Sequence, residues 1–335
     1  MKRKVPATVI TGFLGAGKTT LVRHLLANAR GRRIALIVNE FGDVGVDGDL
    51  LASCGIEGCS DDDVIELANG CLCCTVADEF LPTMQKLLDR AAPPEHIVIE
   101  TSGLALPKPL VKAFHWPEIR SRVTVDGVVA VVDAGAVASG RFADTPEMMA
   151  QPDHDNPLEE VFEDQLACAD MVLLNKSDLV DGAALDALHG ELSARLRAGV
   201  RVLPTRMGAI DPLVLLGLSA AAEDDLASRP SHHDMEDDHD HDDFESFAVA
   251  LPEIADAEAL EQRLVAAIAA HDILRLKGFL AVAGKPTRAV VQAVGARVER
   301  YFDRPWKPGE ERRSRLVVIG RKGLDREAIE AMILD

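Results

Sequence analysis

The chain has 335 residues, 47% of them hydrophobic, which is enough for a sizeable core and more than one average domain. Its net charge of −19 and its 4% aromatic residues argue against nucleic-acid binding, which needs clustered Lys and Arg. We therefore expect a folded globular protein of two domains that has no nucleic-acid partner.

The first residues are basic, but the apolar run behind them is short and is interrupted by Gly12 and Gly15, which indicates a first strand rather than a signal peptide. No stretch approaches the roughly 18 to 20 uncharged residues that span a bilayer. Six cysteines in a chain of this length do not resemble a small secreted disulfide framework. These features predict a cytoplasmic protein without a membrane segment.

Apolar runs alternate with amphipathic helical stretches from the N-terminus to about residue 225, a pattern typical of a parallel sheet flanked by helices. Several runs are continuously Val, Ile and Leu, as strands buried on both faces require. The predicted strands are 8–11, 34–39, 96–100, 127–133, 171–175 and 201–204. The predicted helices are 19–29, 77–90, 158–169 and 183–198.

The first strand is followed by Gly-Phe-Leu-Gly-Ala-Gly-Lys-Thr at residues 12–19, which fits the P-loop pattern and opens a helix. Backbone N–H groups of such a loop curl around phosphates, and the helix N-terminus adds a favourable dipole. We expect Lys18 to reach the β- and γ-phosphates and the Thr19 hydroxyl to bind Mg²⁺. The alternative is a tight glycine-rich turn. The expected nucleotide-binding residues of the loop are Gly12, Gly15, Ala16, Gly17, Lys18, Thr19 and Thr20.

Three thiols lie within four residues in Asn-Gly-Cys-Leu-Cys-Cys at 69–74, just before a predicted helix. A helix N-terminus favours the thiolate, and three thiolates suit Zn²⁺, Co²⁺ or Cu⁺ better than Mg²⁺. A redox dithiol is the alternative, because Cys71 and Cys74 also form a C-x-x-C. The third adjacent thiol, Cys73, favours a metal site. We expect Cys168 to be a core residue, and Cys54 and Cys59 are either further ligands or incidental thiols.

Two later motifs follow predicted strands. Residues 100–103 read Glu-Thr-Ser-Gly, where P-loop proteins place an acid near the metal and a Gly facing the γ-phosphate, so Glu100 is a candidate to hold Mg²⁺ through water. An ordinary acid at a strand end is the alternative. Residues 175–178 read Asn-Lys-Ser-Asp, a guanine-reading pattern that comprises Asn175, Lys176 and Asp178. A carboxylate accepts hydrogen bonds from guanine N1–H and the exocyclic amine, which adenine does not supply, so GTP is favoured over ATP.

The composition changes sharply at residues 231–243, which hold four His and seven acids without a hydrophobic period. We expect a solvated linker, with weak extra metal binding as the alternative. Beyond it, strand-like runs at 244–251, 274–282, 288–293 and 315–319 and helices at 257–270 and 325–334 predict a smaller α+β domain. The expected domains are 1–225, the linker 226–243, and 244–335.

Taken together, the P-loop, residues 39–42 (Asn-Glu-Phe-Gly), the thiol segment and the two later motifs resemble the CobW-type metallochaperone GTPases in order and spacing. The His-rich linker and residues 275–279 (Arg-Leu-Lys-Gly-Phe) extend the resemblance over essentially the whole chain. Residues 43–51 and 66–78 are most similar to the branch of that family associated with cobalt supply for cobalamin synthesis.

The resemblance implies a GTPase whose Cys71, Cys73 and Cys74 hold a transition metal in the GTP-bound form and release it to a client metalloprotein after hydrolysis. Glu40 becomes a candidate to position the attacking water or to bridge to Mg²⁺, with a surface acid as the alternative. Cobalt, with the cobalt-inserting chelatase as client, is implied by the resemblance alone. Such a thiolate site binds Zn²⁺ more tightly than Co²⁺.

Three other functions are also compatible with this sequence. One is a zinc chaperone that serves other metalloproteins. Another is a metal buffer or sensor that does not turn over GTP. The last is a nucleotide-dependent activator that acts on its partner by binding alone, without need of the thiols.

Overall fold

The computed structural model forms two compact units, one before residue 232 and one from residue 244. No helix within the residues that it describes is long and apolar enough to cross a membrane. The described residues are 4–29, 31–39, 64–67, 80–139, 157–231, 244–271, 273–294, 297–306, 310–321 and 323–334.

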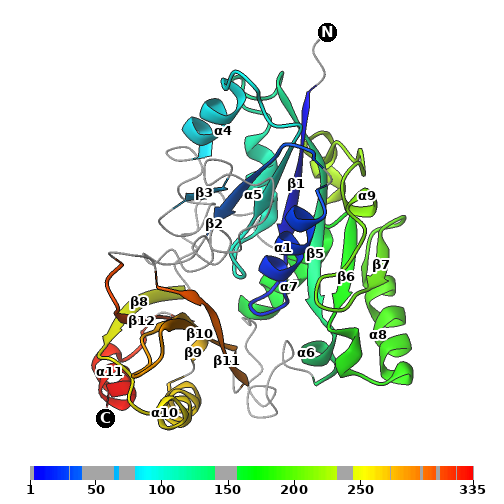
Figure 1. Cartoon of the computed structure of the whole chain (residues 1–335). Coiled ribbons are helices and arrows are strands. Elements are labelled where there is room, and N and C mark those ends of the chain that lie inside the picture. Colours follow the sequence, from blue (N-terminus) through cyan, green and yellow to red (C-terminus); the bar gives the residue numbers. More distant parts are fainter. Residues whose placement is uncertain are drawn as a thin grey trace. The chain divides into compact units, whose positions relative to one another are not determined.

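The first unit is built on a seven-stranded parallel sheet with the order β3-β2-β4-β1-β5-β6-β7 (Figure 1). Four of its strands coincide with predicted ones, and two, β1 and β5, begin earlier than predicted because they pair from Val5 and Val123 onward. β3 was not predicted. The strands are β1 (Val5–Thr11), β2 (Ile34–Asn39), β3 (Val64–Leu67), β4 (His96–Glu100), β5 (Val123–Asp133), β6 (Met171–Asn175) and β7 (Arg201–Pro204).

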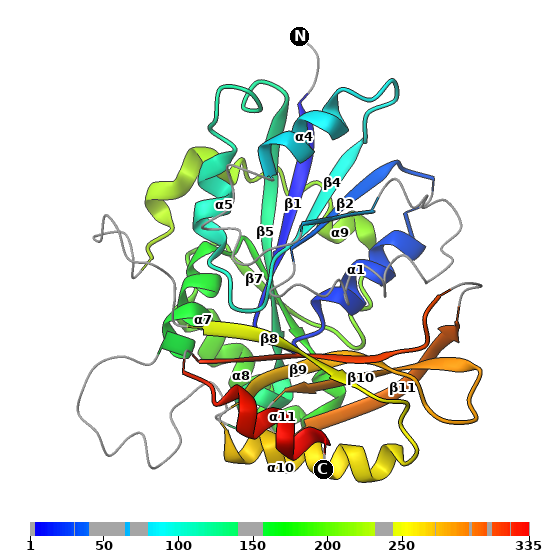
Figure 2. The same ribbon diagram turned by 90° about the vertical axis from the view of Figure 1, so that its left-hand side faces the viewer.

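Helices cover both faces of this sheet, and Figure 2 shows α1 on the opposite side from α5 and α7. The short helices α5, α6 and α9 were not predicted. The elements are α1 (Lys18–Ala27), α4 (Leu81–Leu88), α5 (Pro107–Ala113), α6 (Ala134–Ala138), α7 (Pro157–Cys168), α8 (Gly182–Arg195) and α9 (Pro212–Leu215), with 3₁₀ turns η3 (Ser177–Leu179) and η4 (Ala222–Ser228).

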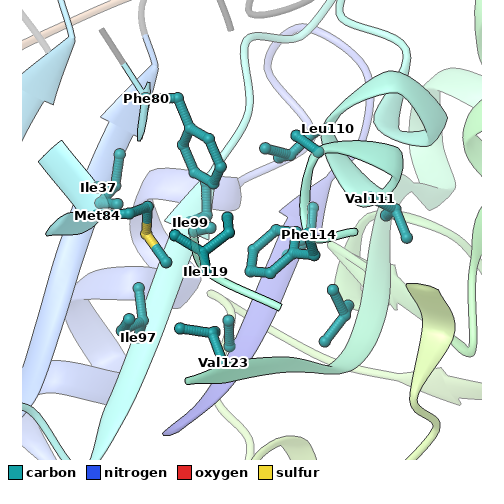
Figure 3. Close-up of a cluster of buried hydrophobic side chains, with 14 of the residues drawn as sticks. Ile37, Phe80, Met84, Ile97, Ile99, Leu110, Val111, Phe114, Ile119 and Val123 are labelled. Atoms are coloured by element: carbon teal, nitrogen blue, oxygen red, sulfur yellow. The ribbon is translucent and has the colours of Figure 1, made fainter. Parts of the chain in front are cut away.

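The main apolar cluster of this unit lies between the sheet and helices α4 and α5 (Figure 3). Phe80 and Phe114 meet edge to face at its centre, with ring centroids 5.6 Å apart. Ile37, Ile97 and Ile99 complete it from neighbouring strands. This burial on both faces explains why the strands read as continuous apolar runs.

Because all strands are parallel, their carboxyl ends meet at one edge of the sheet, where open α/β sheets bind ligands. Ile10 near the end of β1 pairs with Glu100, the last residue of β4. Asp133 and Asn175 are paired at the ends of β5 and β6. The topology therefore brings motifs that are far apart in sequence to one edge.

The second unit is a five-stranded antiparallel sheet with the order β11-β10-β9-β12-β8, and α10 and α11 share an apolar core with it. The predicted fold class, a helix-flanked parallel sheet followed by a smaller α+β unit, is confirmed. β11 was not predicted. The elements are β8 (Phe244–Leu251), α10 (Ala257–Ala270), β9 (Ile273–Leu280), β10 (Thr287–Val294), β11 (Arg297–Pro305), β12 (Ser314–Arg321) and α11 (Arg326–Leu334).

Candidate functional site

The loop between β1 and α1 takes a conformation that only glycine allows. Gly12, Gly15 and Gly17 have φ values of 135°, 71° and 105°. A Cβ on Gly12 would lie 2.2 Å from the Val131 carbonyl oxygen, and one on Gly17 would lie 2.3 Å from Asn175 Nδ2. The loop is therefore wrapped tightly around the end of α1, with β5 and β6 against it.

Lys18 is the first residue of α1 and its side chain folds back over the loop. Its Nζ donates hydrogen bonds to the carbonyl oxygens of Gly12 at 2.7 Å and Phe13 at 3.2 Å. The side chain is 6% exposed. The ammonium group thus lies inside the loop, where the positive end of the helix dipole adds to its potential, as an anion site requires.

The next residue, Thr19, meets the acid predicted to lie near the metal. Its Oγ1 donates a 2.7 Å hydrogen bond to Oε1 of Glu100, which is 3% exposed at the end of β4. A hydroxyl and a carboxylate are oxygen ligands of the kind that Mg²⁺ prefers. This donor set fits magnesium, and Thr20 lies beside it, half-buried in the same first turn.

Asn175 connects the loop to the far side of the site. Its Nδ2 donates to the Ala16 carbonyl at 2.9 Å, while Oδ1 accepts from Thr205 Oγ1 at 3.2 Å and from the Gly208 N–H at 3.0 Å. The side chain is 2% exposed. Its amide thus joins protein groups on both sides, so in this structure Asn175 is a positioning residue.

Lys176 and Asp178 follow Asn175 at the carboxyl edge of the sheet. Lys176 has a left-handed φ of 57°, and its Nζ lies 2.7 Å from Oδ2 of Asp133 at the end of β5. Asp133 also caps α6 by accepting from the Ala136 N–H at 3.1 Å. Asp178 is exposed on η3, next to Leu179. The edge thus combines a fixed ion pair with an accessible carboxylate.

Residues 205–208, which follow β7, also belong to this site, although no sequence motif predicted them as site residues. The Ser177 N–H donates to the Thr205 carbonyl, and Gly208 packs so closely on α1 that a Cβ would lie 2.7 Å from Leu21 N. Met207 is 73% exposed beside them. The only sequence signal was a threonine and a glycine close behind the last apolar strand.

The structure brings Lys18, Thr19, Glu100 and the 175–178 motif together, but not every expected residue can be located. Glu40, Cys71, Cys73 and Cys74 lie outside the described residues, as do Cys54, Cys59 and most of the His-rich linker. No cluster of three or more metal-binding side chains occurs in the part of the chain that is described. Cys168 is buried as expected, and burial raises the pKa of its thiol to about 11.

A glycine loop between a strand and a helix, followed by Lys-Thr and an acid from the adjacent strand, defines the class of P-loop nucleotide-binding proteins. Residues 6–204 match the family described as "CobW/HypB/UreG, nucleotide-binding domain", and residues 244–335 match the "Cobalamin synthesis protein cobW C-terminal domain". The chain belongs to the CobW/HypB/UreG family of P-loop GTPases and metallochaperones, so the resemblance seen in the sequence is confirmed.

Two relatives are similar to this chain over nearly its whole length. One, from a Sinorhizobium species, is named "Zinc chaperone CobW" and is 56% identical over 98% of this chain and 96% of its own. The other, of the same name from Pseudomonas aeruginosa, is 55% identical over 97% and 90%. A crystal structure of Zn(II)-bound YjiA GTPase from E. coli matches 98% of both chains at 29% identity, with a TM-score of 0.46. The names of these relatives specify zinc.

Proposed function

We propose that this protein hydrolyses GTP and uses the cycle to load Zn²⁺ onto Cys71, Cys73 and Cys74 and to deliver it to a client metalloprotein. The observation that carries the nucleotide half is the Thr19–Glu100 hydrogen bond of 2.7 Å beside the buried Lys18. The cargo half is supported by the thiol spacing and by the two relatives named zinc chaperones.

Phosphate binding follows from the loop. Backbone N–H groups of Gly15 and Gly17 and the Lys18 ammonium supply positive potential to the β- and γ-phosphates, while the Ala16 N–H donates to the Phe13 carbonyl within the loop at 3.2 Å. Thr19 and Glu100 would hold Mg²⁺, which neutralises charge on the phosphate oxygens when bound. Glu40 is our candidate for orienting the attacking water. Each of these groups acts by position and charge, which is what phosphoryl transfer demands of a protein.

Guanine recognition is assigned to the carboxylate of Asp178. Its two oxygens suit the N1–H and exocyclic amine of guanine, and leaving a carboxylate unpaired against adenine disfavours ATP. Asn175 and residues 205–208 keep the edge in place through the hydrogen bonds of the Asn175 amide. An Asp178→Ala variant is expected to lose GTP preference while phosphate binding persists.

Zinc is proposed as the cargo for two reasons. Thiolates are soft ligands, and in the divalent affinity order zinc exceeds cobalt at such sites. The relatives named zinc chaperones cover at least 97% of this chain. Cobalt delivery to a cobalt chelatase, implied by the resemblance, is the competing proposal, and metal competition separates the two.

The test is phosphate release from GTP by the full chain, with Lys18→Ala as the control, together with competition between Zn²⁺ and Co²⁺. We expect turnover in the wild type, at least 100-fold less in Lys18→Ala, and zinc displacing cobalt in the presence of Mg²⁺ and a non-hydrolysable GTP analogue. Absence of turnover would contradict the GTPase and leave a metal buffer or sensor. Preferential retention of cobalt would overturn the choice of cargo.

A further inference from the structure

The loop between β4 and α5 lies directly against the phosphate-binding loop. Residues 101–106 are all buried. Gly103 approaches the P-loop so closely that a Cβ on it would lie 2.9 Å from Leu14 N and 2.4 Å from Leu14 Cδ2. The loop between β4 and α5 therefore forms the surface on which the P-loop packs on the side of β4.

Three of the six backbone N–H groups of this loop donate to protein acceptors. Thr101 N donates to the Ile10 carbonyl at 2.9 Å, and Ala105 N donates to the Ser102 carbonyl at 3.2 Å. Leu104 N donates to Ser102 Oγ at 3.3 Å. The N–H groups of Ser102, Gly103 and Leu106 make no hydrogen bond to any residue in the described ranges. Of these three residues, Gly103 is the one that packs on Leu14 of the P-loop, so its N–H is the donor that we consider for a ligand there.

Gln165 on α7 holds this loop from the other side. Its Nε2 donates to the carbonyl oxygens of Gly103 and Ala105, each at 3.2 Å. Two carbonyl acceptors require the amide NH₂ to face them, so the orientation of the amide is determined by its partners. α7 itself is fixed, because Phe162 and Leu166 pack in the apolar cluster with β5 and β6.

The oxygen of the Gln165 amide is not satisfied within the described part of the chain. The side chain is 1% exposed, and its Oε1 is buried with no hydrogen-bond partner among the residues that the structure describes. A buried acceptor without a partner is unfavourable, so the amide is kept at this position at a cost that its two donated hydrogen bonds must offset. What the glutamine adds is the pair of hydrogen bonds to the loop.

We propose that Gln165 is a positioning residue that holds the Gly103 loop in register with the P-loop, so that the Gly103 N–H receives the terminal phosphate of GTP. This inference rests on the proposed GTP cycle and names a residue that makes the protein respond to the γ-phosphate. GDP lacks that phosphate and does not depend on the hydrogen bonds of Gln165.

The test measures equilibrium dissociation constants of the full chain for GDP and for a non-hydrolysable GTP analogue, both with Mg²⁺. Two variants remove the donating amide, Gln165→Leu with an apolar side chain and Gln165→Glu with an acceptor in its place. Asp164→Asn is the matched control, because this adjacent buried residue accepts a 2.6 Å hydrogen bond from Ser231 Oγ, whereas the hydrogen bonds to Gly103 and Ala105 come from Gln165.

We expect both Gln165 variants to bind the GTP analogue about ten-fold more weakly and GDP within two-fold of the wild type. Asp164→Asn should keep the ratio of the two constants. Equal weakening of both nucleotides in the Gln165 variants would show a structural role and overturn the inference, as would no change in either. If the wild type binds neither nucleotide, the proposed function fails as well. If the wild type binds both and the Gln165 variants match it, only this inference fails.

Discussion

At the scale of single residues, the glycines of the phosphate-binding loop combine two separate requirements. Gly12 has a φ of 135° and no space for a Cβ, because the Val131 carbonyl oxygen would lie 2.2 Å away. Gly31 has a φ of 78°, but nothing lies within 4 Å of its Cβ position. Substitution of Gly31 by alanine would therefore show the effect of backbone strain alone, whereas substitution of Gly12 would add a steric clash.

We expect Gly12→Ala to lower the free energy of unfolding by at least about 2 kcal/mol more than Gly31→Ala. Gly31→Ala adds only left-handed strain, about 1 kcal/mol. Urea denaturation without nucleotide measures both. Equal destabilisation would show that the Gly12 loop relaxes away from β5.

The Thr19–Glu100 pair is the residue-scale basis of the proposed chemistry. Glu100→Gln keeps an acceptor for the Thr19 hydroxyl but removes the negative charge next to the metal position. We expect kcat for GTP to fall on the order of 100-fold. Thr19→Ser keeps the hydroxyl and should stay within a few-fold. Steady-state phosphate release measures kcat for both variants. A wild-type kcat in Glu100→Gln would contradict a role for Glu100 in the mechanism.

At the scale of elements, two neighbouring strands are joined by a buried histidine. His96 at the start of β4 is 4% exposed and its Nε2 lies 2.8 Å from Thr8 Oγ1 on β1. Burial lowers the pKa of His96 to about 4, with the charge of Asp126 opposing this shift and Arg32 adding to it. His96 is therefore neutral in the folded protein, whereas in the unfolded chain it gains a proton below pH 6.5.

Because only the unfolded state binds this proton between pH 6.5 and 4, stability should fall as the pH falls through that window. His96 contributes roughly 3 kcal/mol to that loss. Denaturation of the wild type and His96→Gln from pH 7.5 to 4.5 isolates the contribution as their difference. Parallel pH profiles would contradict a neutral buried His96.

A second link between elements is the ion pair that attaches the segment after η4 to the turn before β6. Arg229 is 1% exposed; its NH2 lies 2.6 Å from Oδ1 of Asp170, and it also donates to the Cys168 carbonyl. Asp170 also pairs with Arg197 at 3.2 Å, so loss of Arg229 removes the shorter of two ion pairs and the donor to the Cys168 carbonyl. We expect Arg229→Met to cost about 2 kcal/mol, whereas Arg33→Met at the exposed Arg33–Glu95 pair costs under about 0.5 kcal/mol. Guanidinium denaturation measures both variants, and similar small effects would contradict the role of this link.

How far the sequence predicts these elements depends on how each one is buried. β2, β4, β6 and β7 were predicted to the residue, because strands in a covered parallel sheet are continuous apolar runs or follow a βαβ pattern. β11 lies at a sheet edge and holds five charged residues around the adjacent Tyr301 and Phe302, so its sequence has no continuous apolar run to mark it as a strand. α5 has prolines at its first and third positions. Proline usually interrupts a helix, so the sequence did not predict one here, but the first turn of a helix tolerates it.

Some residues of the candidate site could likewise be predicted from the sequence, whereas others could not. The P-loop is local in sequence and could be predicted, as could the acid at the end of β4. The contacts of Asn175 with Ala16 and of Gln165 with Gly103 join residues 159 and 62 positions apart, and no local pattern specifies them. Only the packing of α7 and β6 beside the loops reveals these two positioning residues.

At the scale of the whole molecule, the two units have separate apolar cores, one with α4 and α5 against the parallel sheet and one with α10 and α11 against the antiparallel sheet. We therefore expect calorimetry to resolve two unfolding transitions. GDP with Mg²⁺ at 100 times its Kd should stabilise only the nucleotide-binding unit, by about 2.7 kcal/mol. A single transition that shifts as a whole would show that the units unfold together.

The central claim is that the bound nucleotide controls metal affinity at Cys71, Cys73 and Cys74. The most direct measurement is the Zn²⁺ affinity of the full chain, by chelator competition, with Mg²⁺ and either a GTP analogue or GDP. We expect at least ten-fold tighter binding with the analogue, and no such difference in Lys18→Ala or in the triple Cys→Ser variant. Equal zinc affinity in the two nucleotide states of the wild type would contradict the account.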